Sequence, residues 1–160
     1  MALPMHSRVG RDKQRYGAGG ERLVAGVVPV SSDNTQVLLI QSSRRKGWVL
    51  PKGGWEADEA TQEDAAKREA WEEAGIETTI DKDLGVIDER RTEEQIKKHG
   101  EHAPRAQYRF FQVKVTREAD QWPESHKRAR QWMSYQEARE LLKERPELLE
   151  ALERSSVRRG

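Results

Sequence analysis

The chain has 160 residues, of which 29 are Lys or Arg and 28 are Asp or Glu, so its formal net charge is only +1. This length is typical of one domain with its own hydrophobic core. No apolar run approaches the ~20 residues of a membrane span, and the lack of cysteine excludes disulfides, thiol catalysis and thiolate metal sites. Residues 1–8 show no secretory signal, so we expect a reducing location in the cytoplasm, with the nucleus as a second compartment.

Residues 1–20 are polar and glycine-rich, which predicts a flexible N-terminal lead before a single domain over residues 21–157. Within that domain, apolar runs predict strands and good helix formers predict helices. In chain order we expect strands at 23–30, 37–41 and 47–50, a helix at 61–74, a strand at 84–88, an exposed loop at 89–104, strands at 107–115 and 131–134, and helices from Ser134 to about Glu144 and over 146–154. Mixed strands with a few helices indicate an α/β or α+β domain.

The near-zero net charge hides a segregation along the chain. Residues 1–50 carry a net charge of +5, residues 51–80 carry −6 and residues 81–160 carry +2. An acidic block inside a basic frame suits a site that binds a cation and a polyanion together. Composition alone favours the alternative of ordinary solvated surface helices, so the motifs have to decide.

The predicted helix at 61–74 carries Glu69, Glu72 and Glu73 near its end. At these spacings the three carboxylates share one side of the helix and repel one another, and the helix dipole disfavours anions in the last turn. A divalent cation would remove both costs, and hard oxygen ligands suit Mg²⁺ or Mn²⁺. The alternative is an exposed acidic face on which Arg68 pairs with Glu72.

The run from Gly53 to Ile76 resembles the Nudix box, whose pattern is G-x5-E-x7-R-E-U-x-E-E-x-G-U with U aliphatic. Gly54 matches the first glycine, and the end of the box is matched by Arg68, Glu69, Glu72, Glu73, Gly75 and Ile76. There are two departures from the pattern. The first glutamate falls at Ala60, with Glu59 one residue earlier, and the aliphatic position after Arg-Glu is Ala70.

The resemblance implies an α/β Nudix fold, an α/β/α sandwich with a mixed central sheet, and a hydrolase that requires Mg²⁺ or Mn²⁺. It implies that Glu69 and Glu73 are metal ligands together with the carbonyl of Gly53. Glu72 would activate or orient water through the metal site, and Arg68 would support the acids with Glu59. The same residues make chemical sense, because a metal ion bound by carboxylates can lower the pKa of water and neutralise charge at a pyrophosphate.

Outside the box, basic residues come from many segments, which suits a highly phosphorylated ligand. These flanking segments resemble fungal diphosphoinositol polyphosphate phosphohydrolases, which also hydrolyse diadenosine hexaphosphate, over about residues 8–157. The likeness implies inositol-phosphate contacts from Arg22, Ser42, Arg44, Arg128 and Arg145, with a looser match at Arg105. Charge and neighbourhood add Arg45, Lys52, Lys127 and Arg130.

We therefore expect hydrolysis of the diphosphate of a diphosphoinositol polyphosphate to inositol hexakisphosphate and phosphate, with diadenosine polyphosphates and polyphosphate as further substrates. Two alternatives remain: a dinucleoside polyphosphate hydrolase, and a catalytically silent domain that binds inositol phosphates or RNA. We expect a monomer that acts on a small molecule, with no membrane or nucleic-acid partner. Ala60 favours the silent domain, whereas the complete set of Glu69, Glu72 and Glu73 opposes it.

Overall fold

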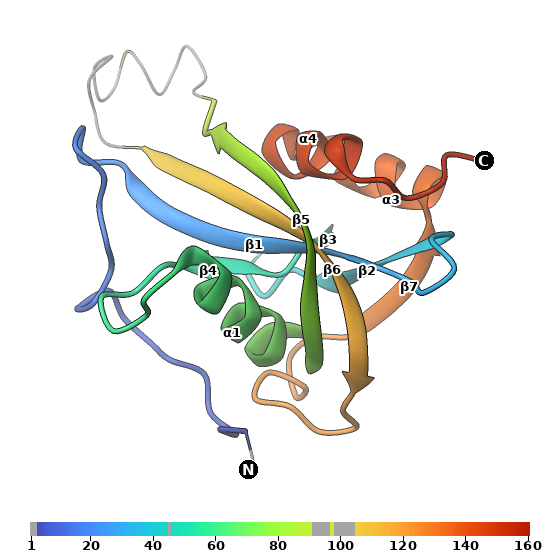
Figure 1. The fold of residues 1–160 in the computed structure, drawn as a ribbon, viewed down its shortest axis with the longest axis horizontal. Helices are drawn as coiled ribbons and strands as arrows, with labels where there is room; N and C mark the ends of the chain where they lie inside the picture. Colours follow the sequence, from blue (N-terminus) through green and yellow to red (C-terminus); the bar gives the residue numbers. More distant parts are fainter. Residues whose placement is uncertain (1–2, 45, 91–96, 98–104) are drawn as a thin grey trace.

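In the computed structural model, which describes residues 3–44, 46–90, 97 and 105–160, a seven-stranded mixed sheet forms the middle layer (Figure 1). Its strands run in the order β3-β2-β1-β6-β5, with β4 paired to β1 and β7 paired to β2. The strands are β1 (Arg22–Val30), β2 (Gln36–Gln41), β3 (Trp48–Val49), β4 (Lys52–Gly54), β5 (Ile76–Asp88), β6 (Ala106–Glu118) and β7 (Arg130–Ser134). Among these strands β1 and β6 pair in parallel and the other pairs are antiparallel.

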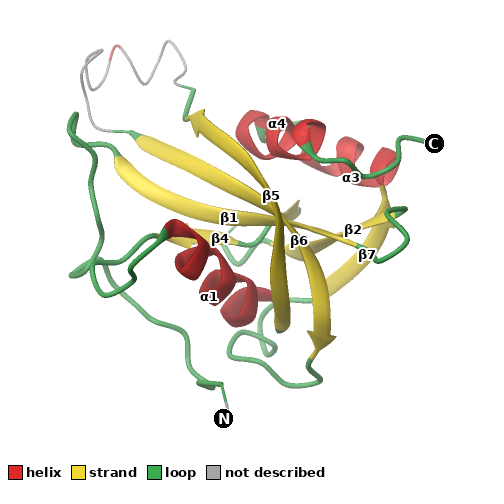
Figure 2. Ribbon diagram, in the orientation of Figure 1, coloured by secondary structure: helices red, strands yellow, loops and turns green. Residues whose placement is uncertain are grey.

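Helices cover both faces of the sheet, as the sequence predicts for an α/β sandwich. Figure 2 shows α1 (Gln62–Ala74) on one face, with α3 (Tyr135–Leu142) and α4 (Pro146–Arg154) on the other. Because both faces are covered, β1 reads as a continuous apolar run, and its residues from Val24 to Val30 are all buried. No described helix is long and apolar enough to cross a membrane.

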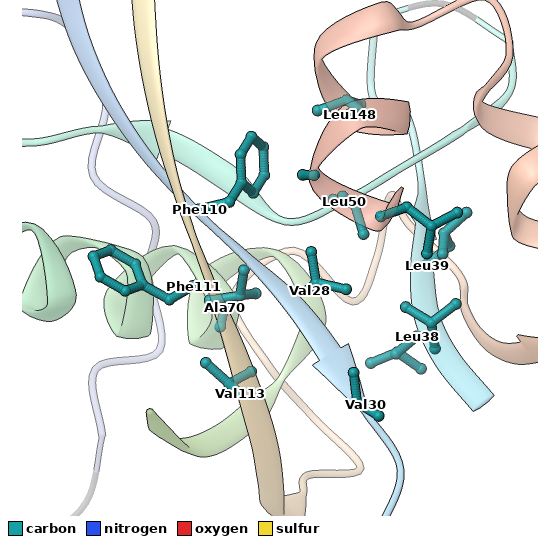
Figure 3. Close-up of a cluster of buried hydrophobic side chains, with 14 of the residues drawn as sticks. Val28, Val30, Leu38, Leu39, Leu50, Ala70, Phe110, Phe111, Val113 and Leu148 are labelled. Atoms are coloured by element: carbon teal, nitrogen blue, oxygen red, sulfur yellow. The ribbon is translucent and has the colours of Figure 1, made fainter. Parts of the chain in front are cut away.

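The core is built by neighbouring residues of the same strand that point to opposite faces. Figure 3 shows Phe111 on the α1 side of β6 with Ala70, and Phe110 on the other side toward Leu148. Both phenylalanines are buried, at 0% and 1% exposure for Phe110 and Phe111. This alternation is the two-residue period of a strand, and it divides one sheet between two apolar layers.

The helix ends follow the signals in the sequence. Thr61 caps α1 by accepting a hydrogen bond from the backbone N–H of Asp64, and Gly75 ends the helix in a left-handed conformation with φ of 66°. Ser134 and Glu137 form a complete capping box at the start of α3. These ends fix where the acidic last turn of α1 lies.

The predicted strand at 84–88 is too short, because β5 begins at Ile76, directly after α1. Most residues between Glu77 and Asp83 are polar and partly exposed, and the pairing with β6 is interrupted by register shifts. A polar, bulged edge strand has no apolar alternation by which a sequence could reveal it. β6 is likewise longer than the predicted 107–115, and most of the loop expected at 89–104 lies outside the described residues.

The N-terminal segment is joined to the domain by its backbone. Gln14 and Tyr16 form isolated β-bridges to Glu56 and Arg22. The indole of Trp71 donates a hydrogen bond to the carbonyl of Pro4 over 2.7 Å. Residues 3–17 therefore run beside α1 and the loop that precedes it (Figure 1).

Candidate functional site

A cavity of about 600 Å³ lies at the acidic face of α1. Its walls come from the N-terminal segment, the start of β1, the loop after β2, strand β4, the segment between β6 and β7, and the start of α4. Segments far apart in the sequence meet there because β4 and β6 both pair with β1, and α1 packs across β1 and β4.

The three glutamates of α1 line this cavity and are almost fully buried, with exposures of 7% for Glu69, 5% for Glu72 and 9% for Glu73. Buried carboxylates need cationic or hydrogen-bonding partners, because ionised oxygens are costly away from water. The alternative of an exposed acidic helix face is therefore wrong. Arg68 does pair with Glu72, at 3.3 Å, but inside the cavity wall.

Burial raises the pKa of all three glutamates. For Glu72 burial and the nearby Glu69 raise the pKa to about 7. Burial and then the charge of Glu73 raise the pKa of Glu69, and burial also raises that of Glu73. Glu69 and Glu73 lie within hydrogen-bonding distance of each other. Buried carboxylates that lie this close together are stabilised in their ionised form by nearby positive charge.

Arg68 supplies part of this positive charge. Its guanidinium donates to both carboxylate oxygens of Glu59, over 2.9 and 3.0 Å, and to the carbonyl of Gly54 over 2.8 Å. Its third nitrogen donates to Glu69 over 2.8 Å and lies 3.3 Å from Glu72. Glu59 thus occupies the place of the glutamate that the pattern puts at residue 60, and Ala60 itself is exposed.

Gly53 permits the close approach of α1 to β4. A Cβ atom at this position would lie 2.1 Å from an oxygen of Glu69, so no larger residue fits without moving that carboxylate. Next to it, the backbone N–H of Lys52 donates to Glu73 over 3.3 Å. Two buried carboxylates therefore lie against the backbone of β4 and form a cradle of oxygen donors of the kind that Mg²⁺ and Mn²⁺ prefer, to which the resemblance adds the carbonyl of Gly53.

The cradle is not a complete ligand set as it stands. Among the described residues, no three His, Cys, Asp or Glu side chains converge on one point as metal ligands. One nitrogen of Arg68 donates to both Glu69 and Glu72. The donor chemistry fits a divalent cation bound by Glu69, Glu73 and the Gly53 backbone, with Glu72 beside it.

Predicted basic residues from five segments line the same cavity as these acids. Burial lowers the pKa of both Arg22 and Lys52, which means that their charges are held at a cost that a bound anion would offset. The predicted ligand-binding residues that line the cavity are Arg22, Ser42, Arg44, Lys52, Lys127, Arg128 and Arg145. An anion in this cavity would lie between the cations and the acids of α1.

Two other predicted ligand-binding residues, Arg105 and Arg130, are not among the described residues that line the cavity. Arg45 lies outside the described residues, and Arg105 is exposed before β6. Arg130 instead donates to the carbonyls of Ala74 and Ala119, over 2.8 and 2.6 Å, and its guanidinium lies 4.2 Å from the centroid of the Trp122 ring. Its charge caps the C-terminus of α1, where the helix dipole favours a cation.

We expect Arg130→Met to lower the free energy of unfolding by about 1–3 kcal/mol, because it leaves buried carbonyls without a donor. Urea denaturation at pH 7 measures this change. Lys143→Met is the control, since its exposed i,i+3 pair with Glu140 contributes little. An equal loss in both variants would contradict the capping role.

Sequence reasoning missed several cavity residues. Arg8, Arg11 and Gln14 belong to the segment predicted to be a flexible lead, yet they line the cavity. Glu124 is 7% exposed, accepts a hydrogen bond from Arg128 over 2.7 Å, and has its backbone N–H bonded to the carbonyl of Glu72. Glu124 and Arg128 are four residues apart, a spacing that predicts a contact in a helix. They lie in a loop, where the same spacing predicts none, so the sequence does not reveal the pair.

The chain is similar to known proteins in sequence and in fold. The model of the NUDIX domain matches residues 20–154. Nudix hydrolase 4 of Arabidopsis thaliana is 39% identical over 145 residues, which cover 84% of this chain and 66% of that protein. Nudix hydrolase 21, chloroplastic, of the same plant is 40% identical over 141 residues and covers 84% of this chain and 67% of its own length. The crystal structure of C. elegans Ap4A hydrolase is similar in fold, with a TM-score of 0.59, 22% identity and coverage of 82% of this chain and 93% of that one.

Proposed function

Because the chain belongs to the Nudix hydrolase family, whose members generally use a divalent metal, we propose that it is a Mg²⁺-dependent hydrolase of diphosphoinositol polyphosphates. Water is added across the P–O–P bond of the ring diphosphate, which gives inositol hexakisphosphate and inorganic phosphate. The chain spans about two thirds of the length of the plant relatives it matches, so this activity is a proposal for the domain.

The observation that carries the proposal is the pairing of buried acids with cations from many segments in one cavity. A substrate with phosphates around a ring has negative charge on every side, and Arg side chains bind phosphate oxygens by charge-assisted hydrogen bonds. No aromatic side chain among the described residues lines this cavity. Stacking of an adenine base therefore lacks a partner there, which favours the inositol substrate over a dinucleoside polyphosphate.

The residues divide the work as follows. Glu69, Glu73 and the Gly53 carbonyl would hold the cation. Arg68, which is hydrogen-bonded to Glu59, keeps Glu69 and Glu72 in place. When bound, the cation supplies positive charge at the diphosphate and lowers the pKa of water. Glu72, whose pKa burial raises to about 7, accepts the proton of the attacking water as general base. The ring phosphates are bound by the basic side chains that line the cavity, among them Arg22 and Arg145.

One experiment tests the reaction. Phosphate release from a diphosphoinositol pentakisphosphate and hydrolysis of diadenosine hexaphosphate are measured with Mg²⁺, with Mn²⁺ and with a chelator. We expect turnover with either metal, none with the chelator, and a higher kcat/KM for the inositol substrate. If neither compound were turned over, the hydrolase proposal would be contradicted. The remaining alternative would be a catalytically silent domain that binds its ligand. A higher kcat/KM for diadenosine hexaphosphate would favour the dinucleoside alternative.

We expect Arg44→Met to raise the KM for the inositol substrate about tenfold to a hundredfold, because a charge-assisted hydrogen bond to phosphate contributes roughly 1.5–3 kcal/mol. Arg44 lines the cavity and is exposed, so the fold does not depend on it. Lys46→Met on the same loop is the matched control, since Lys46 is exposed and is not part of the cavity lining. An equal rise of KM in the two variants would point to general charge attraction rather than to a direct contact between Arg44 and a phosphate.

The cellular location stays a prediction. A reducing compartment is consistent with the absence of cysteine. One plant relative is described as chloroplastic, so the family is not confined to the cytoplasm or the nucleus. The monomeric state is likewise a prediction that light scattering would measure.

A further inference from the structure

The N-terminal segment lies against the turn formed by residues 56–59, just before α1 (Figure 1). The backbone N–H of Arg15 donates to the carbonyl of Trp55 over 2.9 Å, and the N–H of Ala57 donates to the carbonyl of Lys13 over 2.7 Å. Within the turn, the N–H of Glu59 donates to the carbonyl of Glu56 over 3.0 Å. Two chain segments about 40 residues apart are thus tied together at this point.

The side chain of Arg15 joins the carbonyls of this turn. Its Nε donates to the carbonyl of Glu56 over 3.1 Å, and one terminal nitrogen donates to the carbonyls of Ala57 and Glu59, each over 3.0 Å. The guanidinium also lies 4.5 Å from the centroid of the Trp55 ring. A planar fork that bonds three carbonyls of one turn fixes the conformation of that turn, which a single ammonium group does not.

The conformation of this turn decides which residue faces α1. In the Nudix pattern the glutamate that holds the box arginine stands at residue 60, but here residue 60 is an exposed alanine. Glu59 is 7% exposed and forms the two-bond contact with Arg68. The indole of Trp55 donates to the carbonyl of Glu59 over 2.9 Å. Trp55 and Arg15 therefore both donate hydrogen bonds to the same backbone carbonyl.

We propose that Arg15 is a positioning residue, which shapes the 56–59 turn so that Glu59, one residue early, performs the task that the family pattern gives to residue 60. The proposal rests on the proposed hydrolase reaction for its kinetic consequence. Arg15 does not line the cavity and acts through Glu59 on Arg68, which in turn holds Glu69 and Glu72. Loss of Arg15 frees the turn and loosens the acids without removing a phosphate contact.

The first measurement is the kinetics of Arg15→Met under Mg²⁺. We expect kcat to fall roughly tenfold, since small misplacements of positioned groups are costly, while KM stays within about twofold. Lys13→Met removes the same charge from the same segment, but its side chain is 61% exposed and only approaches Asp58, so we expect unchanged kinetics. A rise of KM at constant kcat would show that Arg15 binds substrate and would overturn the proposal.

The second measurement moves the glutamate to the position of the family pattern. In the variant Glu59→Ala/Ala60→Glu the carboxylate no longer depends on the early turn, so adding Arg15→Met should lower kcat by less than about threefold. The same tenfold loss in both backgrounds would overturn the proposal. Arg15→Lys should lose kcat as Arg15→Met does, and full activity of Arg15→Lys would also overturn it, because charge alone would then suffice.

The third measurement needs no activity and separates this proposal from the proposed function. Urea denaturation gives the free energies of unfolding of Arg15→Met, Glu59→Ala and the double variant. We expect the two changes to be non-additive, because Arg15 and Glu59 act as one unit, whereas Lys13→Met and Glu59→Ala should add. Additivity of Arg15→Met and Glu59→Ala would overturn the positioning role even if the wild-type enzyme turned over no substrate.

Discussion

Glu72→Gln should lower kcat by about a hundredfold to ten-thousandfold, the range by which a positioned general base accelerates a reaction. The substitution keeps the size of the side chain and removes its capacity to accept a proton. Glu72 is suited to this task because it lies in the cavity wall, 5% exposed, with a pKa raised by burial to about 7. Steady-state kinetics with the diphosphoinositol substrate measure the loss, and KM should change little.

The matched control is Glu63→Gln in the first turn of the same helix. Glu63 carries the same charge but is only half-buried and lies outside the cavity lining. We expect its kcat to stay within about twofold of wild type. Thermal unfolding of both variants checks that each is folded. Turnover that survives Glu72→Gln unchanged would contradict the role of Glu72 as general base.

Arg68→Met should lower the free energy of unfolding by about 3–5 kcal/mol, the cost of removing one partner from a buried ionic network. The Arg68 side chain is 14% exposed, and its departure leaves the carboxylates of Glu59, Glu69 and Glu72 facing one another. Because these carboxylates are nearly buried, water screens their mutual repulsion only weakly. Urea denaturation at pH 7 without added metal measures the change.

Arg117→Met supplies the comparison for that loss. Arg117 pairs with Glu77 on the protein surface, where the two side chains are 55% and 39% exposed. An exposed pair contributes about 1 kcal/mol at most. If Arg68→Met proved as stable as Arg117→Met, the network would be solvated, and Arg68 would not be what holds the acids together. Added Mg²⁺ should recover part of the lost stability, because cations would bind the freed acids.

The sequence is enough to predict the sandwich and the identity of the acids. Local patterns, such as the apolar run of β1 and the capping signals of α1, predict the strands and helices. The sandwich and the roles of Glu69, Glu72 and Glu73 follow from the resemblance of residues 53–76 to the Nudix box. Most of the predicted cations also line one cavity, because the strands and helices that flank their segments meet there.

What the sequence could not predict depends on contacts between distant segments. Arg130 is one residue among several arginines, and only the fold brings it under the last turn of α1. Glu59 and Ala60 differ by one position, and the turn that chooses between them is held by Arg15, more than 40 residues earlier. The N-terminal segment reads as a linker because its contacts are made by backbone and side-chain hydrogen bonds rather than by an apolar pattern.

The parallel pair of β1 and β6 has a consequence for how the protein is made. Every residue from Arg22 to Val30 pairs with one between Ala106 and Lys114, so the centre of the sheet closes only when most of the chain exists. At roughly 5–20 residues per second, synthesis leaves β1 without this neighbour for several seconds. β1 is also an apolar strand with an open edge during that interval, which is the kind of segment that chaperones bind. Refolding should be slow for the same reason, since a contact of such long range must form before the core is complete.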